Sequence, residues 1–353
     1  MLATRAISTI VLLLISLYQS NQSPEVRQAR GKNGISTSDS KQPLPPDRPA
    51  IEPTGGGEQV NLAVDLVVLD ALVLRQKTGS PVGSLKQEDF VLQEDGVQQQ
   101  ITHFGQDALP LSVIFMVDRG GCLDPFSQKV RRACQEAMIR LKPDDEVALM
   151  AFANTTDLVT GFTTHRERIV QGLDHLPPHD EQAEHCFSEA FFQAADYMRR
   201  AGNPDGRRVI VFITAVTTGF DCGGHSGEEA RQAVMESGSV VCGIIPRTAG
   251  QQMENGLMHA ITTFGGSRHK TSLKQFADDT GGEILTDKPD LLDQTFATLM
   301  EHLRTRYAIS FVSTNTKRDG SFRKLKLDVA PALQKPDDRI VVKTRKGYIA
   351  SRR

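Results

Sequence analysis

Tryptophan is absent from this chain of 353 residues, and tyrosine occurs only four times. Platforms that bind carbohydrate or single-stranded nucleic acid stack their ligands on aromatic rings, so this scarcity argues against both kinds of site. No apolar run reaches the roughly 18 residues that a transmembrane helix needs. The 41 Lys and Arg nearly balance the 43 Asp and Glu, and a net charge of −2 gives the chain no overall attraction for nucleic acid.

Two common enzyme signatures are also missing. The sequence contains neither a Gly-rich phosphate loop nor a Gly-x-Ser-x-Gly nucleophile elbow. What it does contain is an ordinary globular composition, with 39% hydrophobic and 24% charged residues. The length suggests about two domains.

Charge is distributed unevenly along the chain. Residues 304–353 hold 14 Lys and Arg but only 4 Asp and Glu, a net charge of +10, so the remainder carries −12. An acidic body joined to a basic C-terminal region predicts two folding units. We interpret the basic residues as protection of edge strands against aggregation, in preference to a dedicated polyanion or membrane-surface site.

The N-terminal segment is typical of export. An apolar run at 6–17 follows Arg5 and precedes polar residues, which predicts a signal peptide or short anchor at 1–20. A cytoplasmic protein with an apolar start is the alternative. Residues 21–58 are rich in Pro, Ser and Gly and predict a disordered linker, because they offer too little apolar surface to fold.

Two segments alternate between apolar and polar residues with the period of a strand. In the N-terminal β segment, 59–106, we expect strands at 60–68, 69–75, 90–94 and 98–104, with hairpin turns at 77–80 and Asp95-Gly96. In the C-terminal β segment, 305–350, we expect strands at 307–312, 322–329 and 339–343. We predict that the two segments pair with each other and form one composite antiparallel β layer.

Residues 109–304 follow a different pattern, in which buried strands alternate with helices. The expected strands are 111–117, 147–152, 158–162, 208–214, 240–245 and 283–285. The expected helices are 124–141, with Asp124 as its cap, and 166–173, 187–200, 228–236, 273–278 and 289–304. This alternation predicts an α/β domain with a mainly parallel sheet covered by helices on both faces. Binding is expected at the carboxyl ends of its strands.

One stretch of this domain is distinctive. A buried strand ending in Asp118, a loop of small residues, an amphipathic helix and then DEVALMAFANTTDLVTGFT resemble a von Willebrand factor type A domain. The chain as a whole, over about residues 60–350, is similar to the VWFA-related proteins of Acidobacteria. The segments that carry this resemblance are EDFVLQEDGVQQQITHF, LKQFADDTGGEIL and RYAISFVSTNTKRDGSFRKLKLDV. The resemblance implies a Rossmann-like fold.

The resemblance also implies a metal-ion-dependent adhesion site on the top face of the domain. In the family this site combines Asp-x-Ser-x-Ser after the first strand, a Thr at a later helix start and an Asp after the fourth strand. These groups supply the hard oxygens that Mg²⁺ prefers, and a carboxylate of the partner completes the octahedron.

In this sequence most of those ligands are replaced. The first motif keeps Asp118 but has Gly120 and Cys122 in place of the two serines. His185 stands where the family has Thr, and Ala215 where it has Asp. We therefore predict that the Mg²⁺ site is lost. Arg119, beside Asp118, is a candidate for an ion pair with it in place of the metal.

Two interpretations of these replacements remain. In the first, Asp118, Cys122 and His185 form a softer site for an ion such as Zn²⁺, although their spacing matches no zinc motif. In the second, which we favour, the top face uses no metal and binds by shape, or binds nothing. The nearby histidines, His165, His175 and His179, are interpreted as solvated loop and helix-start residues.

The five cysteines fall into two groups. Cys134 lies on an apolar helix stripe and Cys242 in a buried strand, so both are expected in the core. Cys122, Cys186 and Cys222 are expected in top-face loops, where an exported protein can oxidise a pair. We favour a disulfide between Cys186 and Cys222 with Cys122 free, but the sequence leaves the other pairings open.

These features predict a non-enzymatic, exported protein-binding or scaffold module, acting in the periplasm, at the cell envelope or outside the cell. A protein partner would meet the top face at 118–122, His185 and 215–225. Cys122 and His185 offer only a weak case for a nucleophile and base. No nucleic acid is expected as partner, and the N-terminal segment could place the chain near a membrane. The alternative is a structural envelope protein that acts through its β layer and basic strands, with Lys324, Lys326, Lys343 and Lys346 as the residues to test.

Overall fold

The computed structural model describes residues 66–106, 109–180, 183–247 and 270–352. All of them belong to one compact unit, Leu62–Arg353. The signal peptide or anchor expected at 1–20 and the linker expected at 21–58 lie outside the described residues. Within the described part of the chain, no helix combines the length and apolar character needed to cross a membrane.

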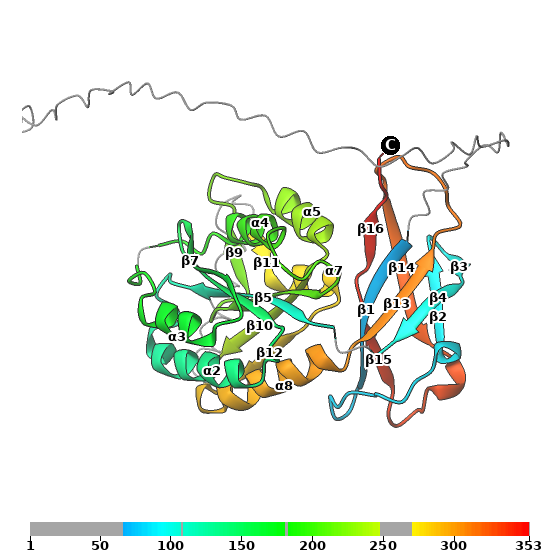
Figure 1. Ribbon diagram of the computed structural model, residues 1–353, viewed down its shortest axis with the longest axis horizontal. Coiled ribbons are helices and arrows are strands. Elements are labelled where there is room, and N and C mark those ends of the chain that lie inside the picture. Colours follow the sequence, from blue (N-terminus) through cyan, green and yellow to red (C-terminus); the bar gives the residue numbers. More distant parts are fainter. Residues whose placement is uncertain (1–65, 107–108, 181–182, 248–269, 353) are drawn as a thin grey trace, which may run out of the picture. The chain divides into compact units, whose positions relative to one another are not determined.

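A six-stranded sheet forms the centre of the α/β domain (Figure 1). Its strand order is β12-β10-β8-β5-β6-β7, and every neighbouring pair is parallel except β6 and β7. The strands are β5 (Leu111–Asp118), β6 (Glu146–Phe152), β7 (Thr156–Thr163), β8 (Arg207–Ile213), β10 (Val240–Pro246) and β12 (Ile284–Asp287). All eight residues of β5 are buried, as expected of a central strand covered on both faces.

Helices cover both faces of this sheet (Figure 1). One face is covered by α2 (Ser127–Ile139), α3 (Arg166–Asp174) and α8 (Leu292–Arg304). The other is covered by α4 (Phe187–Met198), α5 (Gly227–Ser237) and α7 (Leu273–Thr280). The fold class predicted from the sequence, a mainly parallel sheet with helices on both sides, is therefore confirmed.

Local sequence explains where several helices begin and end. Ser226 and Glu229 form a reciprocal capping box at the start of α5. Gly238 and Gly281 end α5 and α7 in the left-handed conformation, which glycine adopts without steric strain. At Asp124 the chain first forms a 3₁₀ turn, Asp124–Phe126, and the side chain of Asp124 does not cap it.

The flanking segments build two further four-stranded sheets, with the orders β15-β1-β13-β4 and β16-β14-β2-β3. Their strands are β1 (Leu66–Arg75), β2 (Phe90–Glu94), β3 (Val97–Gln99), β4 (Ile101–Gly105), β13 (Tyr307–Val312), β14 (Phe322–Val329), β15 (Ile340–Lys343) and β16 (Gly347–Ile349). A small pair, β9 (Thr218–Phe220) and β11 (Lys270–Ser272), lies within the α/β part. Short 3₁₀ turns occur at Gln87–Asp89, Pro289–Leu291 and Pro331–Leu333.

Strands of the N- and C-terminal segments do pair, as β1 with β13 and β2 with β14. The single composite layer predicted from the sequence is nevertheless wrong. The two sheets enclose one apolar core, to which β1, β4 and β13 of one sheet and β2 and β14 of the other contribute buried residues. The segment expected at 98–104 breaks at Gln100, which sends β3 and β4 into different sheets. Residues 66–75 form one strand, because no turn residue interrupts them.

Three basic residues of the C-terminal region pair with carboxylates in other parts of the molecule. Arg304 pairs with Asp145, Lys343 Nζ lies 3.5 Å from Glu283, and Lys346 Nζ lies 3.0 Å from Asp279. All three carboxylates belong to the acidic α/β part of the chain. Basic residues near the C-terminus therefore lie beside acidic residues of the α/β part in the folded chain.

Arg207 belongs to a second, deeply buried ion pair. Its side chain is 1% exposed, and its Nε lies 2.8 Å from Asp70 Oδ1. The same guanidinium donates to the carbonyl oxygens of Leu303 (3.2 Å) and Arg306 (2.8 Å). One side chain thus connects β8, the end of α8 and β1.

We expect the substitution Arg207→Leu to lower the free energy of unfolding by about 3 kcal/mol, because it leaves Asp70 and two carbonyl groups without their donor. Urea denaturation of the full chain measures this. Arg199→Leu is the matched control, since Arg199 pairs with Asp196 at the surface and its loss should change stability by less than about 1 kcal/mol. Equal losses in the two variants would contradict the assignment.

Candidate functional site

The order of the strands places a crevice at the centre of the sheet. From β5 the chain continues to β6 and β7 on one side, and then to β8, β10 and β12 on the other. Asp118 is the last residue of β5, and Thr214 directly follows β8, which is the parallel neighbour of β5. Ligands of open α/β sheets bind where the strand order reverses in this way, at the carboxyl ends.

The carboxylate of Asp118 is the centre of the site. The residue is 1% exposed. Its Oδ1 accepts a hydrogen bond from the Gly120 N–H (2.9 Å), and its Oδ2 accepts from the hydroxyl of Thr214 (2.6 Å) and the thiol of Cys122 (3.3 Å). The Nδ1 of His185 lies 2.9–3.0 Å from the two oxygens. Four donors therefore surround an anion that has almost no contact with solvent.

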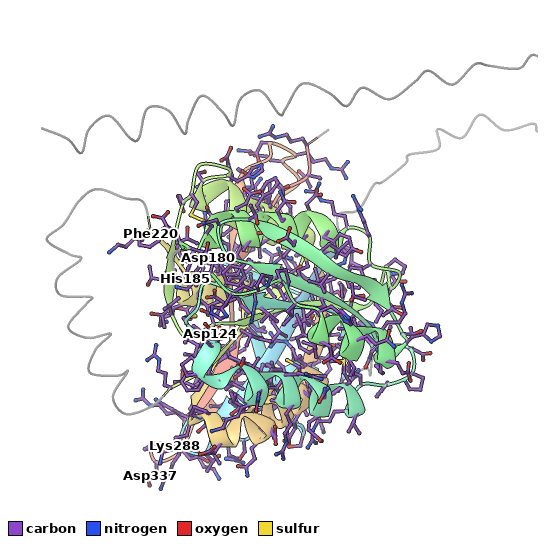
Figure 2. All side chains as sticks on the ribbon, turned by 90° about the vertical axis from the view of Figure 1, so that its left-hand side faces the viewer. Asp124, Asp180, His185, Phe220, Lys288 and Asp337 are labelled. Carbon is purple, nitrogen blue, oxygen red and sulfur yellow. A yellow bond between two sulfur atoms is a disulfide. The ribbon has the colours of Figure 1, made fainter. Side chains whose placement is uncertain are left out.

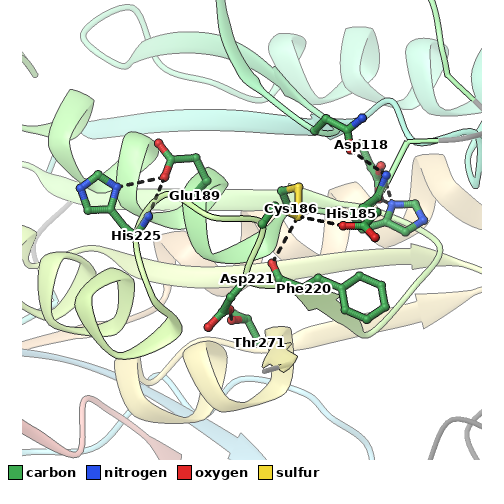
Figure 3. Close-up of a disulfide and its surroundings, with 11 residues drawn as sticks. Asp118, His185, Cys186, Glu189, Phe220, Asp221, His225 and Thr271 are labelled. Atoms are coloured by element: carbon green, nitrogen blue, oxygen red, sulfur yellow. Dashed lines mark hydrogen bonds and ion pairs between the residues drawn. A yellow bond between two sulfur atoms is a disulfide. The ribbon is translucent and has the colours of Figure 1, made fainter. Parts of the chain in front are cut away.

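His185 reaches Asp118 from the loop before α4 (Figure 3). Its own carbonyl accepts from the Phe220 N–H of β9 (2.8 Å), and the next residue, Cys186, donates its N–H to the Ala153 carbonyl (3.2 Å). The side chain of His185 is 18% exposed. The imidazole is thus held between the end of β5 and β9, with a small part of it accessible.

The replacements at positions 120 and 185 depend on each other. A Cβ atom at Gly120 would lie 2.7 Å from both Cε1 and Nδ1 of His185, which is closer than real Cβ contacts allow. The imidazole can therefore lie beside Asp118 only because residue 120 has no side chain. Sequence reasoning identified both positions but gave no indication of this steric coupling.

Cys122 contributes a thiol rather than a nucleophile. Its Sγ accepts from the Ala215 N–H (3.4 Å) and lies 3.7 Å from the Thr214 hydroxyl. Burial, reinforced by the charge of Asp118, raises the pKa of the Cys122 thiol far above its ordinary value. Cys122 and His185 both contact the carboxylate of Asp118, and among the described residues no hydrogen bond joins them to each other.

The predicted ion pair between Arg119 and Asp118 is wrong. The Nε of Arg119 donates instead to the Pro177 carbonyl (2.8 Å), and its own carbonyl accepts from the Asp180 N–H (3.0 Å). The reason is that the acceptor positions of Asp118 are already occupied by closer donors. Arg119 therefore fixes the segment around Pro177 rather than the carboxylate.

Thr214 is the site residue that the sequence analysis missed. It is fully buried and makes the shortest of the hydrogen bonds to Asp118. Ala215, which the sequence analysis named, contributes only its backbone N–H. The sequence does show that Thr214 carries a hydroxyl at the carboxyl end of a buried strand. It does not show that this strand lies next to the one that ends at Asp118, which depends on the strand order.

The structure also locates the cysteines and the other histidines that the sequence singled out. The structure joins Cys186 and Cys222 in a disulfide, leaves Cys122 free, and buries Cys134 and Cys242 in the core. Of the remaining histidines, His179 Nε2 lies 3.0 Å from Asp124 Oδ2, and His175 Nδ1 lies 2.7 Å from the Gln171 carbonyl, while His165 precedes α3.

Among the described residues, one group of three His, Cys or acidic residues has the spacing of metal ligands. It consists of Asp118, Cys122 and His185, whose ligand atoms lie within 4.8 Å of one another. Oxygen, sulfur and imidazole nitrogen are the atom types that Zn²⁺ takes. Mg²⁺ takes hard oxygens, and around this carboxylate the only other side-chain oxygen that contacts it among the described residues is the Thr214 hydroxyl. The histidine of this group, His185, is labelled in Figure 2, where Asp124, Asp180 and Phe220 lie in the same part of the molecule.

We expect Gly120→Ala to lower the free energy of unfolding by about 1–3 kcal/mol, because the added methyl group forces His185 away from Asp118. In the double variant Gly120→Ala/His185→Ala the methyl group meets no ring, so the two losses should not add. Thermal and urea unfolding of the wild type, both single variants and the double variant measure the coupling. Strict additivity would show that the imidazole is not packed against residue 120.

The family model of the von Willebrand factor type A domain matches residues 113–217. This span begins in β5 and ends just after β8, so it includes Asp118, Cys122, His185 and Ala215. No curated protein matches the chain.

Several solved structures are similar to this chain at low sequence identity. Proximal thread matrix protein 1 from the mussel byssus is 15% identical, with a TM-score of 0.41, over 58% of this chain and 49% of that one, so this chain spans about half the length of that protein. BatB from Bacteroides thetaiotaomicron is 16% identical over 54% of this chain and 99% of that one, with a TM-score of 0.37. A von Willebrand factor type A protein from Catenulispora acidiphila is 10% identical over 82% and 75% of the two chains, with a TM-score of 0.42.

The family match and the strand order agree. Residues 113–217 follow the family's pattern, and they form the central strands of a mainly parallel sheet whose carboxyl ends carry Asp118 and Thr214. The narrower similarity to the Acidobacterial proteins stays a prediction. The chain therefore carries a von Willebrand factor type A domain, with the family's pattern lying in residues 113–217.

Proposed function

We propose that this chain is an exported, non-enzymatic protein-binding module whose top face works without Mg²⁺. The observation that carries the proposal is the hydrogen bonding of Asp118, whose carboxylate receives four donors from the protein itself. In the family a metal ion occupies the space beside this carboxylate. Here the imidazole of His185 lies within 3.0 Å of it and fills the volume that Gly120 leaves free.

This arrangement changes the chemistry that a partner would meet. A metal ion attracts the carboxylate of a partner, whereas His185 uses Nδ1 for Asp118 and has Nε2 left for another contact. The partner group suited to this position is therefore one that forms a hydrogen bond with an imidazole nitrogen, in place of the carboxylate that a metal ion attracts.

The loop after β8 supplies the rest of the proposed binding surface. Val216, Thr217, Thr218 and Phe220 are all half-buried, and none carries a charge. Their neighbour Asp221 accepts from the Thr271 hydroxyl (2.5 Å) and the Gly227 N–H (3.0 Å), which orders the loop. An ordered, neutral surface that includes an aromatic side chain suits a protein partner better than a polyanion.

The state of Cys122 supports a role without catalysis. A cysteine nucleophile needs a thiolate and a neighbouring base, and here burial and the charge of Asp118 keep the thiol protonated. His185 is turned to Asp118 rather than to the sulfur. The disulfide between Cys186 and Cys222 supports export, because such bonds persist in oxidising compartments.

The alternative of a structural protein that acts through basic strands has less support. Of the four lysines in question, Lys326, Lys343 and Lys346 each have a carboxylate partner within the molecule. Charges neutralised in this way contribute little to the attraction of an anionic surface. The top face is therefore the better candidate for the binding function.

A zinc site at the same position is the second candidate function, favoured by the convergence of Asp118, Cys122 and His185. If Zn²⁺ binds there, these three residues hold it, and Cys122 binds as a thiolate after losing its proton. Such a site would replace the hydrogen bonds that the carboxylate now accepts. Metal binding therefore separates the two candidates directly.

For the metal-free function we expect Mg²⁺ and Zn²⁺ to leave the melting temperature of the purified chain unchanged, because an ion that binds the folded state raises it by mass action. Metal analysis of the protein as purified, under reducing conditions, accompanies the titration. Near-stoichiometric Zn²⁺ that disappears in Cys122→Ser and His185→Ala would reject the metal-free function in favour of the zinc site.

We expect capture of a protein partner from envelope extracts to persist in EDTA and to be lost in Phe220→Asp, which places a charge in the neutral loop. Leu158→Asp is the matched control, because Leu158 is exposed on the edge strand β7 and lies outside the loop. Retention of the same partner by Phe220→Asp, or loss of it in EDTA, would reject the proposed surface.

A further inference from the structure

The disulfide connects two segments at the candidate site (Figure 3). Cys186 directly follows His185 and is the N-cap residue of α4. Cys222 lies two residues beyond Phe220, in the loop between β9 and α5. Cys186 is 1% exposed, whereas Cys222 is half-buried. The bond thus ties the residue next to the imidazole to the loop of the proposed binding surface.

Noncovalent contacts join this loop to the His185 segment and to α4 on either side of Cys222. On one side the Phe220 N–H donates to the His185 carbonyl (2.8 Å). On the other the carboxylate of Glu189 accepts from the N–H (3.1 Å) and Nδ1 (2.9 Å) of His225, whose ring stacks on Phe192 with the centroids 3.3 Å apart. Between these two anchors, the disulfide is the connection from residue 222 to the start of α4.

We propose that the disulfide between Cys186 and Cys222 is a redox-controlled clamp that fixes the top face in its binding form and releases it on reduction. The inference rests on the proposed function, because the clamped residues belong to that surface. Reduction removes the covalent link and leaves the His185 segment and β9 joined by noncovalent contacts such as the hydrogen bond from Phe220. The imidazole then gains freedom to leave Asp118, and Cys222 gains freedom to move away from Cys186, while His225 stays bound to Glu189 of α4.

The two cysteines have different parts in the exchange with a reducing dithiol. The incoming thiolate attacks Sγ of Cys222, the more exposed sulfur, and forms a mixed disulfide while the bond to Cys186 breaks. Cys186 leaves as a thiolate at the N-terminus of the 12-residue helix α4, where backbone N–H groups and the helix dipole stabilise negative charge.

The second thiol of the reductant completes the reaction. It attacks its own sulfur in the mixed disulfide, the reductant becomes a cyclic disulfide, and Cys222 is released. The two thiol protons of the dithiol end on the two cysteines. The dithiol thus supplies both electrons and both protons, and no other reactant is needed.

Cys122 reports on this change, because its half-buried thiol donates to Asp118 as long as the cluster is closed. We expect opening of the disulfide to increase the rate at which iodoacetamide labels Cys122 by about tenfold. Three forms of the full chain are labelled in the presence of EDTA. They are the oxidised protein, the protein reduced with a dithiol that is then removed, and the double variant Cys186→Ser/Cys222→Ser. Peptide mass spectrometry assigns the label to each cysteine.

Cys134 and Cys242 are the internal controls. Both are buried in the core, and burial raises the pKa of each thiol to about 12. They should stay protected in all three forms. Equal labelling of all free cysteines would show general unfolding and overturn the clamp. An unchanged rate at Cys122, in the reduced protein and in the double variant, would overturn it as well.

Partner capture is measured separately on the oxidised and reduced chain. Faster labelling of Cys122 without any captured partner would reject the protein-binding function and leave the clamp in place. Capture that is the same in both redox states, with unchanged labelling, would reject the clamp and leave the binding function.

Discussion

The buried carboxylate of Asp118 is the constraint on which the site depends. An anion that is 1% exposed is stable only if the protein supplies hydrogen bonds in place of water. Three separate parts of the chain do so: the loop after β5, the end of β8 and the loop before α4. The carboxylate therefore draws these segments together. Gly120 leaves room for the imidazole that donates to this carboxylate, and Cys122 can donate to it only while its thiol is protonated.

Charge compensation also shapes the rest of the chain. The basic C-terminal region and the acidic α/β part differ strongly in net charge, yet their residues pair with each other, as Lys343 with Glu283 and Lys346 with Asp279. Arg207 and Asp70 make a buried pair of the same kind. Buried charges need partners with good geometry, so such pairs restrict which arrangements of the strands are acceptable. The surface that remains for a partner is correspondingly less basic than the sequence suggests.

Much of the fold could be predicted because strands and helices differ in period and length. The apolar run that became β5 and the stripe of Val130, Cys134 and Met138 on α2 were recognisable for this reason. The pairing of the outer strands was not, because alternation shows that one face is buried but not against which sheet. Gln100 illustrates this: β3 and β4 on either side of it look like one strand in the sequence, and they join different sheets.

The candidate site divides in the same way. Local sequence determined that Asp118 ends a buried strand. The resemblance to the family predicted that the serines of its motif are replaced and that His185 and Ala215 stand at two further ligand positions. Only the tertiary structure decided that the imidazole lies against Asp118, that Arg119 turns to Pro177, and that Thr214 completes the cluster. The physical reason is distance along the chain. These contacts join residues up to 96 positions apart, and their geometry is set by strand order and close packing, which the residues themselves do not display.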